Sequence, residues 1–178
     1  QLLTLLPHME RAIGARSVKD HLVVITEDEN GALAEVARTL RAPIVPHAPV
    51  GGRYSVLSPV GLLPGYVAGV DVEGIIDGAA SMAERCLGTD MQENPAFWGG
   101  ATQYLLAEQG KSQTILMPYF ERLNKVGSWF RQLWAESLGK LDGEGNHRGL
   151  TPARALGATD QHSQLQLYLQ GPADKQFT

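Results

Sequence analysis

The sequence is poor in cysteine and has no long apolar run. Cys86 is the one cysteine among 178 residues, which excludes an internal disulfide framework and a metal site built from paired cysteines. We interpret Cys86 as a small buried apolar residue. No apolar run approaches the roughly eighteen residues that a membrane-spanning helix needs, so we expect no membrane partner.

The chain also lacks a basic surface signature. Fifteen Lys and Arg residues are balanced by nineteen Asp and Glu residues, which gives a net charge of −4, and no basic cluster is interleaved with aromatic residues. This composition argues against nucleic acid as a partner. With 43% hydrophobic residues the chain can bury a sizeable core, and we expect a soluble cytoplasmic protein.

Short apolar runs alternate with helical periodicity. HLVVIT (21–26) is typical of a strand covered on both faces, EDENGALAEVARTL (27–40) has helical spacing, and PIVP (43–46) is a second extended segment. QTILMP (113–118) is another apolar run with a helical pattern after it. This alternation predicts an α/β fold in which parallel sheets are flanked by helices.

Other segments predict further helices. Residues 1–15 have helical spacing, and Asp71 is a candidate N-cap for a helix over 71–86. Residues 56–69 are so apolar that they predict a helix in the interior or at a subunit contact. The polar, turn-rich residues 87–96 indicate a boundary between two units.

The segment WFRQLWAESLGK (129–140) is the first candidate for chemistry. Gln132 and Glu136 lie four residues apart, so on a helix both side chains project from one face. Gly139 offers a left-handed position just after the helix. A carboxylate held at the last turn of a helix is suited to proton transfer. The alternative is an ordinary amphipathic helix that ends at glycine.

A glycine pair precedes an arginine in APVGGRYSVL (48–57). Two adjacent glycines, Gly51 and Gly52, permit unusual backbone torsions and close approach of a ligand. The guanidinium of Arg53 could then donate several hydrogen bonds to an anion or an oxygen-rich intermediate. A plain loop with a solvated arginine is the alternative.

A single histidine, His162, stands out near the C-terminal end. Asp160 can cap a helix whose first turn holds His162, and Leu165, Leu167 and Leu169 are expected to bury one side of it. Imidazole exchanges protons near neutral pH, so His162 suits general acid–base catalysis. A purely structural histidine remains the alternative.

Three stretches are informative together, and they are GGRYSVLSPVGLLP, WAESLGK and ALGATDQHSQLQLYLQGPADK. In order and in separation they closely resemble the signature segments of the glucose-6-phosphate isomerase family, also called phosphoglucose isomerase, in its bacterial form. The resemblance implies sugar isomerase (SIS) domains, each a parallel sheet between helical layers. Residues 1–90 would be the later part of a first SIS domain, and 91–178 the early and central part of a second.

The resemblance also implies an aldose–ketose isomerase that interconverts glucose 6-phosphate and fructose 6-phosphate in glycolysis and gluconeogenesis. Glu136 would be the base that moves a proton between C1 and C2, and His162 would open the sugar ring from the neighbouring subunit of a homodimer. Arg53, Gly52 and Gln132 would contact the substrate. No metal or organic cofactor is implied.

The family's phosphate-binding loop and catalytic lysine are not found in this sequence, so we expect an internal piece of a longer enzyme, which alone could lack activity. Two other functions remain open. One is a non-catalytic SIS module that binds phosphosugars. The other is an interaction protein that dimerises through the apolar helix 56–69.

Overall fold

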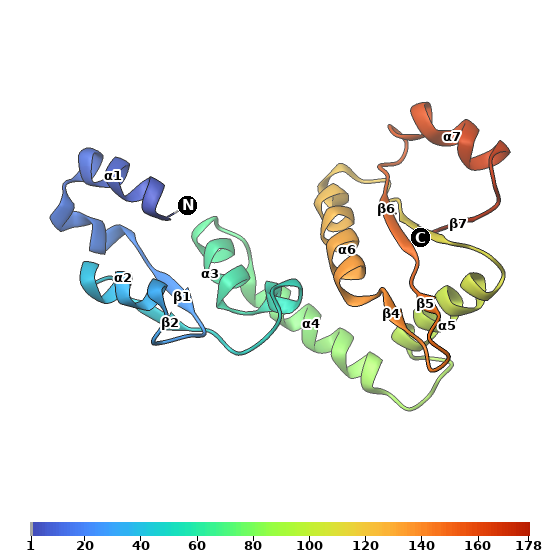
Figure 1. Ribbon diagram of the computed structural model, residues 1–178, viewed down its shortest axis with the longest axis horizontal. Coiled ribbons are helices and arrows are strands. Elements are labelled where there is room, and N and C mark those ends of the chain that lie inside the picture. Colours follow the sequence, from blue (N-terminus) through green and yellow to red (C-terminus); the bar gives the residue numbers. More distant parts are fainter. Residues whose placement is uncertain (1) are drawn as a thin grey trace. The chain divides into compact units, whose positions relative to one another are not determined.

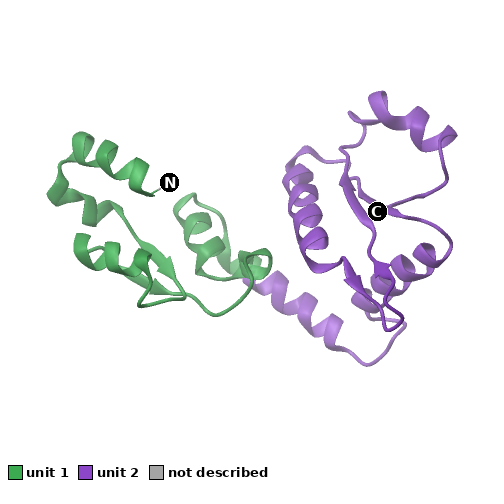
Figure 2. Ribbon diagram, viewed as in Figure 1, with its two compact units in different colours: residues 1–75 green, residues 76–178 purple. Residues whose placement is uncertain are grey.

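A computed structural model describes residues 2–178, which divide into two compact units (Figures 1 and 2). Unit 1 ends at Ile75 and unit 2 runs from Ile76 to Thr178. The division falls inside helix α4 (Val72–Leu87), whereas the SIS-domain boundary expected from the sequence lies at residues 90 and 91. That domain assignment stays a prediction. Each unit is described below by itself.

Unit 1 is built on two short parallel strands, β1 (Val24–Thr26) and β2 (Ile44–Pro46). Helix α2 (Ala32–Leu40) connects them, which confirms the strand–helix–strand unit predicted from the sequence. The strands pair in register from Val24 opposite Ile44 to Thr26 opposite Pro46. A small apolar core joins strand and helix, and its buried members are Val24, Ala37 and Ala42.

Helix α1 (Leu2–Ile13) opens the described part of unit 1 and includes Pro7. Gln1, which the expected helix 1–15 included, lies outside the described residues. A 3₁₀ segment, η1 (Ala15–His21), follows and buries Val18.

Helix α3 (Pro59–Val67) lies within the predicted segment 56–69 but starts three residues later, and it does not lie in the interior of its unit. The Ser58 hydroxyl accepts a hydrogen bond from Val60 N at 3.3 Å, and Pro59 occupies the first turn, where its missing N–H costs nothing. Tyr66 and Val67, however, are 69% and 79% exposed. The prediction of an interior helix is therefore wrong for unit 1 itself, and the alternative of a subunit contact stays a prediction.

The helix α4 begins where its cap was predicted. The Asp71 carboxylate accepts a hydrogen bond from Gly74 N at 2.9 Å, which satisfies a backbone donor that has no partner within the first turn.

Unit 2 contains a three-stranded parallel sheet in the order β6–β3–β7. Its strands are β3 (Gln113–Leu116), β6 (Thr151–Arg154) and β7 (Lys175–Phe177). The central strand is the QTILMP run, and Thr114 and Ile115 within it are buried. The mixed α/β fold class with parallel sheets is confirmed.

Several helices accompany this sheet. Helix α5 (Pro95–Glu108) is capped by Asn94, whose side chain accepts from Phe97 N at 3.0 Å. After η3 (Glu121–Leu123), helix α6 (Asn124–Ser137) lies along β6 (Figure 1). Its buried Gly127 permits this approach, because a Cβ there would lie 3.3 Å from Cβ of Arg154. Helix α7 (Gln161–Gln170) precedes β7.

A small antiparallel hairpin follows α6. It pairs β4 (Lys140–Leu141) with β5 (His147–Arg148). Within residues 2–178, no helix combines the length and apolar character that crossing a bilayer requires.

Candidate active site

Gln132 and Glu136 project from the same face of α6. Gln132 Nε2 donates a hydrogen bond to Glu136 Oε1 at 3.1 Å, and both residues are exposed. This confirms the spatial relationship predicted from their spacing. An amide donor beside a carboxylate restrains the orientation of the carboxylate. The pair therefore presents an accessible, oriented carboxylate.

Aromatic residues fasten the other side of α6. The rings of Phe130 and Trp134 lie 5.3 Å apart, and Trp134 Nε1 donates to the carbonyl oxygen of Leu150 at 3.2 Å. Since Leu150 directly precedes β6, this hydrogen bond ties the helix to the sheet. Glu136 thus lies on a helix that Trp134 attaches to the segment before β6.

The helix ends directly after Glu136. Ser137 Oγ donates to Leu133 O at 2.6 Å, and Leu138 is extended at the C-cap. Gly139 follows with φ of +81°, a left-handed conformation that favours glycine. The predicted glycine stop is confirmed, and Glu136 lies in the last turn of α6.

Arg53 belongs to unit 1 and lies in the 3₁₀ segment η2 (Gly52–Leu57). Its guanidinium carbon is 4.7 Å from the centre of the Tyr54 ring, a cation–π geometry that orients the half-buried side chain. Ser55, in the same segment, is buried and donates from Oγ to Gly52 O at 2.7 Å. Arg53 therefore stands on a short ordered helical turn.

The glycine pair does not use the unusual torsions expected of it. Gly51 has a φ of −57°, which other residues adopt readily. At Gly52, no atom beyond its chain neighbours lies within 4 Å of the place a Cβ would take. Gly52 instead leaves open space next to Arg53, which suits the close approach of a ligand, whereas a Cβ at Gly51 would lie 3.6 Å from Nη1 of Arg53.

His162 lies, as predicted, in the first turn of α7, where it is exposed. Asp160 occupies the N-cap position as predicted, but its side chain makes no capping hydrogen bond. Its Oδ2 accepts instead from Leu156 N at 2.7 Å, so it orders the loop before the helix. No hydrogen bond joins the side chains of His162 and Glu136 within the described unit 2.

The expected apolar side of α7 is not buried. Leu165, Leu167 and Leu169 are 41%, 57% and 74% exposed. Residues two apart on a helix differ by about 200° in direction, so this spacing does not produce one apolar face. The prediction was wrong because it applied strand periodicity to a helix.

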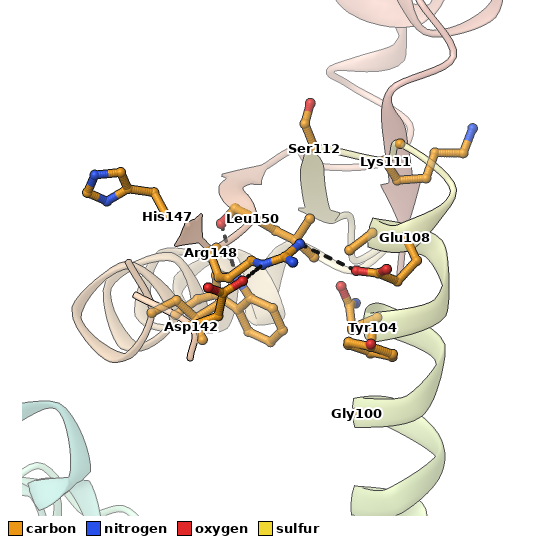
Figure 3. Close-up of a pocket in the computed structure, with 15 residues that line it drawn as sticks. Gly100, Tyr104, Glu108, Lys111, Ser112, Asp142, His147, Arg148 and Leu150 are labelled. Atoms are coloured by element: carbon orange, nitrogen blue, oxygen red, sulfur yellow. Dashed lines mark hydrogen bonds and ion pairs between the residues drawn. The ribbon is translucent and has the colours of Figure 1, made fainter. Parts of the chain in front are cut away.

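A cavity of about 620 Å³ lies in unit 2 between α5, the end of α6 and the β4–β5 hairpin (Figure 3). Trp134, Tyr104 and Arg148 are among its lining residues. Arg148 donates from Nε to Asp142 Oδ2 at 2.7 Å and lies 3.6 Å from Glu108 Oε1 through Nη1. The hydrogen bond from Arg148 holds the pKa of Asp142 well below its usual range. Sequence reasoning missed this ion-pair cluster.

Among residues 2–178, no group of three or more His, Cys, Asp and Glu side chains is arranged to hold a metal ion.

Comparison with known proteins decides the family. A family model described as phosphoglucose isomerase matches residues 8–173, which is most of the chain. The chain belongs to the phosphoglucose isomerase family. The resemblance found from three short stretches is thereby confirmed.

Curated relatives of this chain carry names that agree with its membership of the phosphoglucose isomerase family. The chain is 44% identical to glucose-6-phosphate isomerase of Carboxydothermus hydrogenoformans and 46% identical to that of Rubrobacter xylanophilus, over 98% and 94% of its length. It spans 38% of the length of each of these relatives.

One solved structure also matches. The crystal structure of a hypothetical protein from Thermus thermophilus aligns with a TM-score of 0.90 and 37% sequence identity. The alignment covers 99% of this chain and 42% of the other.

Proposed function

We propose that this chain forms part of an enzyme that interconverts glucose 6-phosphate and fructose 6-phosphate. Membership of the phosphoglucose isomerase family and relatives named glucose-6-phosphate isomerase support the proposal. The observation that carries it is the hydrogen-bonded pair of Gln132 and Glu136, an oriented carboxylate at an accessible helix end. Glycolysis and gluconeogenesis would be its metabolic setting, and the cytoplasm its location.

Glu136 is the base in this proposal. Isomerisation removes a proton from C2 of the open-chain aldose, forms a cis-enediol(ate), and returns a proton to C1. One carboxylate that reaches both carbons can perform both transfers. Gln132 restrains that carboxylate and also contacts the sugar.

In this proposal Arg53 stabilises the charge of the enediolate intermediate, and Gly52 leaves room for the sugar. The enediolate carries negative charge on its oxygens, and a fixed guanidinium stabilises such charge as it develops. Stacking on Tyr54 limits the rotamers of Arg53 before substrate arrives, which lowers the entropy lost on binding. The open space at Gly52 admits the sugar backbone.

His162 opens the ring of the cyclic substrate by exchanging a proton with the ring oxygen. We place it in the active site of a homodimer, contributed by the neighbouring subunit, in line with its exposed position and the absence of a hydrogen bond to Glu136 in the described unit 2. The reaction needs no cofactor, because no electron or group leaves the sugar. In this proposal residues 1–90 belong to one SIS domain and 91–178 to the next.

One observation favours a second candidate. Helix α3 exposes Val60, Tyr66 and Val67 at 44%, 69% and 79%. An apolar surface of this kind is typical of an interface, so a non-catalytic phosphosugar-binding or dimerising protein is the competing function.

A coupled isomerase assay of the full-length protein separates the two. Glu136→Gln keeps the shape of the side chain but removes the base, so turnover falls by about a thousandfold or more, within the range for loss of a catalytic base and its electrostatics. Glu84→Gln, at an exposed position on α4, is the matched control and leaves turnover unchanged. Full turnover in Glu136→Gln, or no turnover in the unaltered protein, would refute the proposal.

A further inference from the structure

The backbone that follows Glu136 passes directly into the β4–β5 hairpin. Leu138 N donates to Trp134 O at 3.1 Å, which closes the last turn of α6. The next amide, Gly139 N, donates to Arg148 O at 3.1 Å. The hairpin therefore holds the chain three residues after Glu136.

Close backbone packing reinforces this hold. A Cβ built on Gly149 would lie 3.0 Å from Gly139 N and 3.5 Å from Cβ of Leu138. Gly149 has φ of +147°, which side chains rarely permit. The backbone at Gly149, directly after β5, thus lies against the residues that follow α6.

The hairpin is in turn held by one arginine. Asp142 accepts from the backbone amides of Glu144 and Asn146, both at 2.9 Å, and from Arg148 Nε at 2.7 Å. Figure 3 shows the Arg148 guanidinium between the carboxylates of Asp142 and Glu108. Because Glu108 belongs to α5, Arg148 joins the hairpin to a neighbouring helix.

We propose that Arg148 is a positioning residue for Glu136. Its side chain fixes the hairpin between Asp142 and Glu108, and its backbone oxygen fixes Gly139, so the last turn of α6 and the carboxylate on it are held in one place. The inference rests on the proposed role of Glu136 as the base. Displacing a catalytic group by about 1 Å can cost up to a hundredfold in rate.

The contribution of Arg148 is local. The side chains of Arg148 and Glu108 are 58% and 50% exposed, and exposed ion pairs contribute little to global stability. Helix ends open independently of the rest of a fold. Removing the guanidinium therefore loosens the end of α6 without unfolding unit 2.

The test compares Arg148→Met, Arg148→Lys and the control Arg85→Met in the full-length protein. Arg85 is exposed on α4 and takes no part in the hairpin. Steady-state kinetics and hydrogen–deuterium exchange of the segment 133–141 are measured on each. We expect Arg148→Met to lower kcat on the order of tenfold with KM within about twofold, and to speed exchange at Leu138 and Gly139.

Arg148→Lys keeps one ion pair, so we expect kcat and the exchange rate at Leu138 and Gly139 to return part of the way to their unaltered values. Arg85→Met is expected to change neither kcat nor this exchange rate. Unchanged exchange and kcat in Arg148→Met would overturn the inference. So would faster exchange throughout unit 2, because Arg148 would then be a general structural residue. An unaltered protein without isomerase activity would overturn the proposed function instead, and the exchange at Leu138 and Gly139 would still decide whether Arg148 fixes the end of α6.

Discussion

Gln132 Nε2 lies 3.1 Å from Glu136 Oε1, so one turn of α6 both orients a carboxylate and supplies it with a donor. The other candidate groups lie on other elements. Arg53 is on η2 of unit 1, where its guanidinium contacts the Tyr54 ring, and His162 is in the first turn of α7 in unit 2. The carboxylate that we propose as the base therefore has its hydrogen-bond donor on its own helix.

Replacing Gln132 tests this local ordering. Gln132→Leu removes the donor and lets the Glu136 carboxylate rotate, so kcat/KM falls by about tenfold, the size expected for one hydrogen bond to a charged group. Steady-state assay of the full-length protein measures the loss. Gln109→Leu, at an exposed position after α5, is the control. Equal kcat/KM in Gln132→Leu and unaltered protein would show that the hydrogen bond has no catalytic role.

Mixing two inactive variants tests whether His162 acts across a dimer. Glu136→Gln and His162→Gln are each expected to be inactive alone. In a mixed dimer, one site receives both altered residues and the other receives both unaltered ones. Random exchange of subunits then restores about one quarter of normal activity, since half the dimers are mixed and each has one intact site. No recovery after verified subunit exchange would place His162 and Glu136 of one site in the same subunit.

The pH dependence of the hairpin follows from the lowered pKa of Asp142. The Arg148 side chain is the main cause and the Asn146 amide contributes next. Because the folded-state pKa is depressed, the stabilisation is present above the ordinary Asp pKa of about 3.9 and is lost as pH falls through the lower folded value. We therefore expect the Asp142 carboxylate to stay ionised and paired with Arg148 from pH 7 to about 4. Carbon-13 NMR of the Asp142 carboxyl group measures this.

In Arg148→Met, the titration midpoint of Asp142 moves up toward the ordinary value, whereas Arg85→Met leaves it in place. An Asp142 that titrates near 3.9 in the unaltered protein would contradict the ion pair.

An aromatic pair links α7 to the edge of the sheet. The rings of Tyr168 and Phe177 are 4.8 Å apart at 70°, an edge-to-face arrangement. Phe177→Leu keeps an apolar side chain but loses this geometry, so the free energy of unfolding falls by about 1 kcal/mol. Denaturant unfolding measures it. Phe120→Leu, a replacement of similar exposure, is the control, with a change below about 0.5 kcal/mol. Equal effects would remove any special contribution from the pair.

The sequence carried enough information for the strands with strong local patterns. HLVVIT and QTILMP are apolar runs that became β1 and β3, and Asp71 and Gly139 mark the helix ends expected of them. β6 and β7 escaped prediction because TPAR and KQF have no apolar run, and both pair with the buried β3. Their strand conformation comes from tertiary pairing and not from local propensity.

The candidate site was also predictable only where the contact is local in the sequence. Spacing alone placed Gln132 and Glu136 together, because four residues make about one helical turn. The Arg148–Asp142–Glu108 cluster was not predictable, since Glu108 lies on another element, far before Arg148 in the sequence. Such a contact depends on how α5 and the hairpin fold together.

The most direct test of the central claim is solvent deuterium incorporation during isomerisation in heavy water by the full-length protein. If Glu136 carries a proton between C2 and C1 through an enediolate, the base exchanges with solvent, and deuterium appears at C1 of fructose 6-phosphate or C2 of glucose 6-phosphate. The account predicts this label in the unaltered protein and its loss, together with turnover, in Glu136→Gln. Labelling and turnover at the unaltered rate in Glu136→Gln would contradict it.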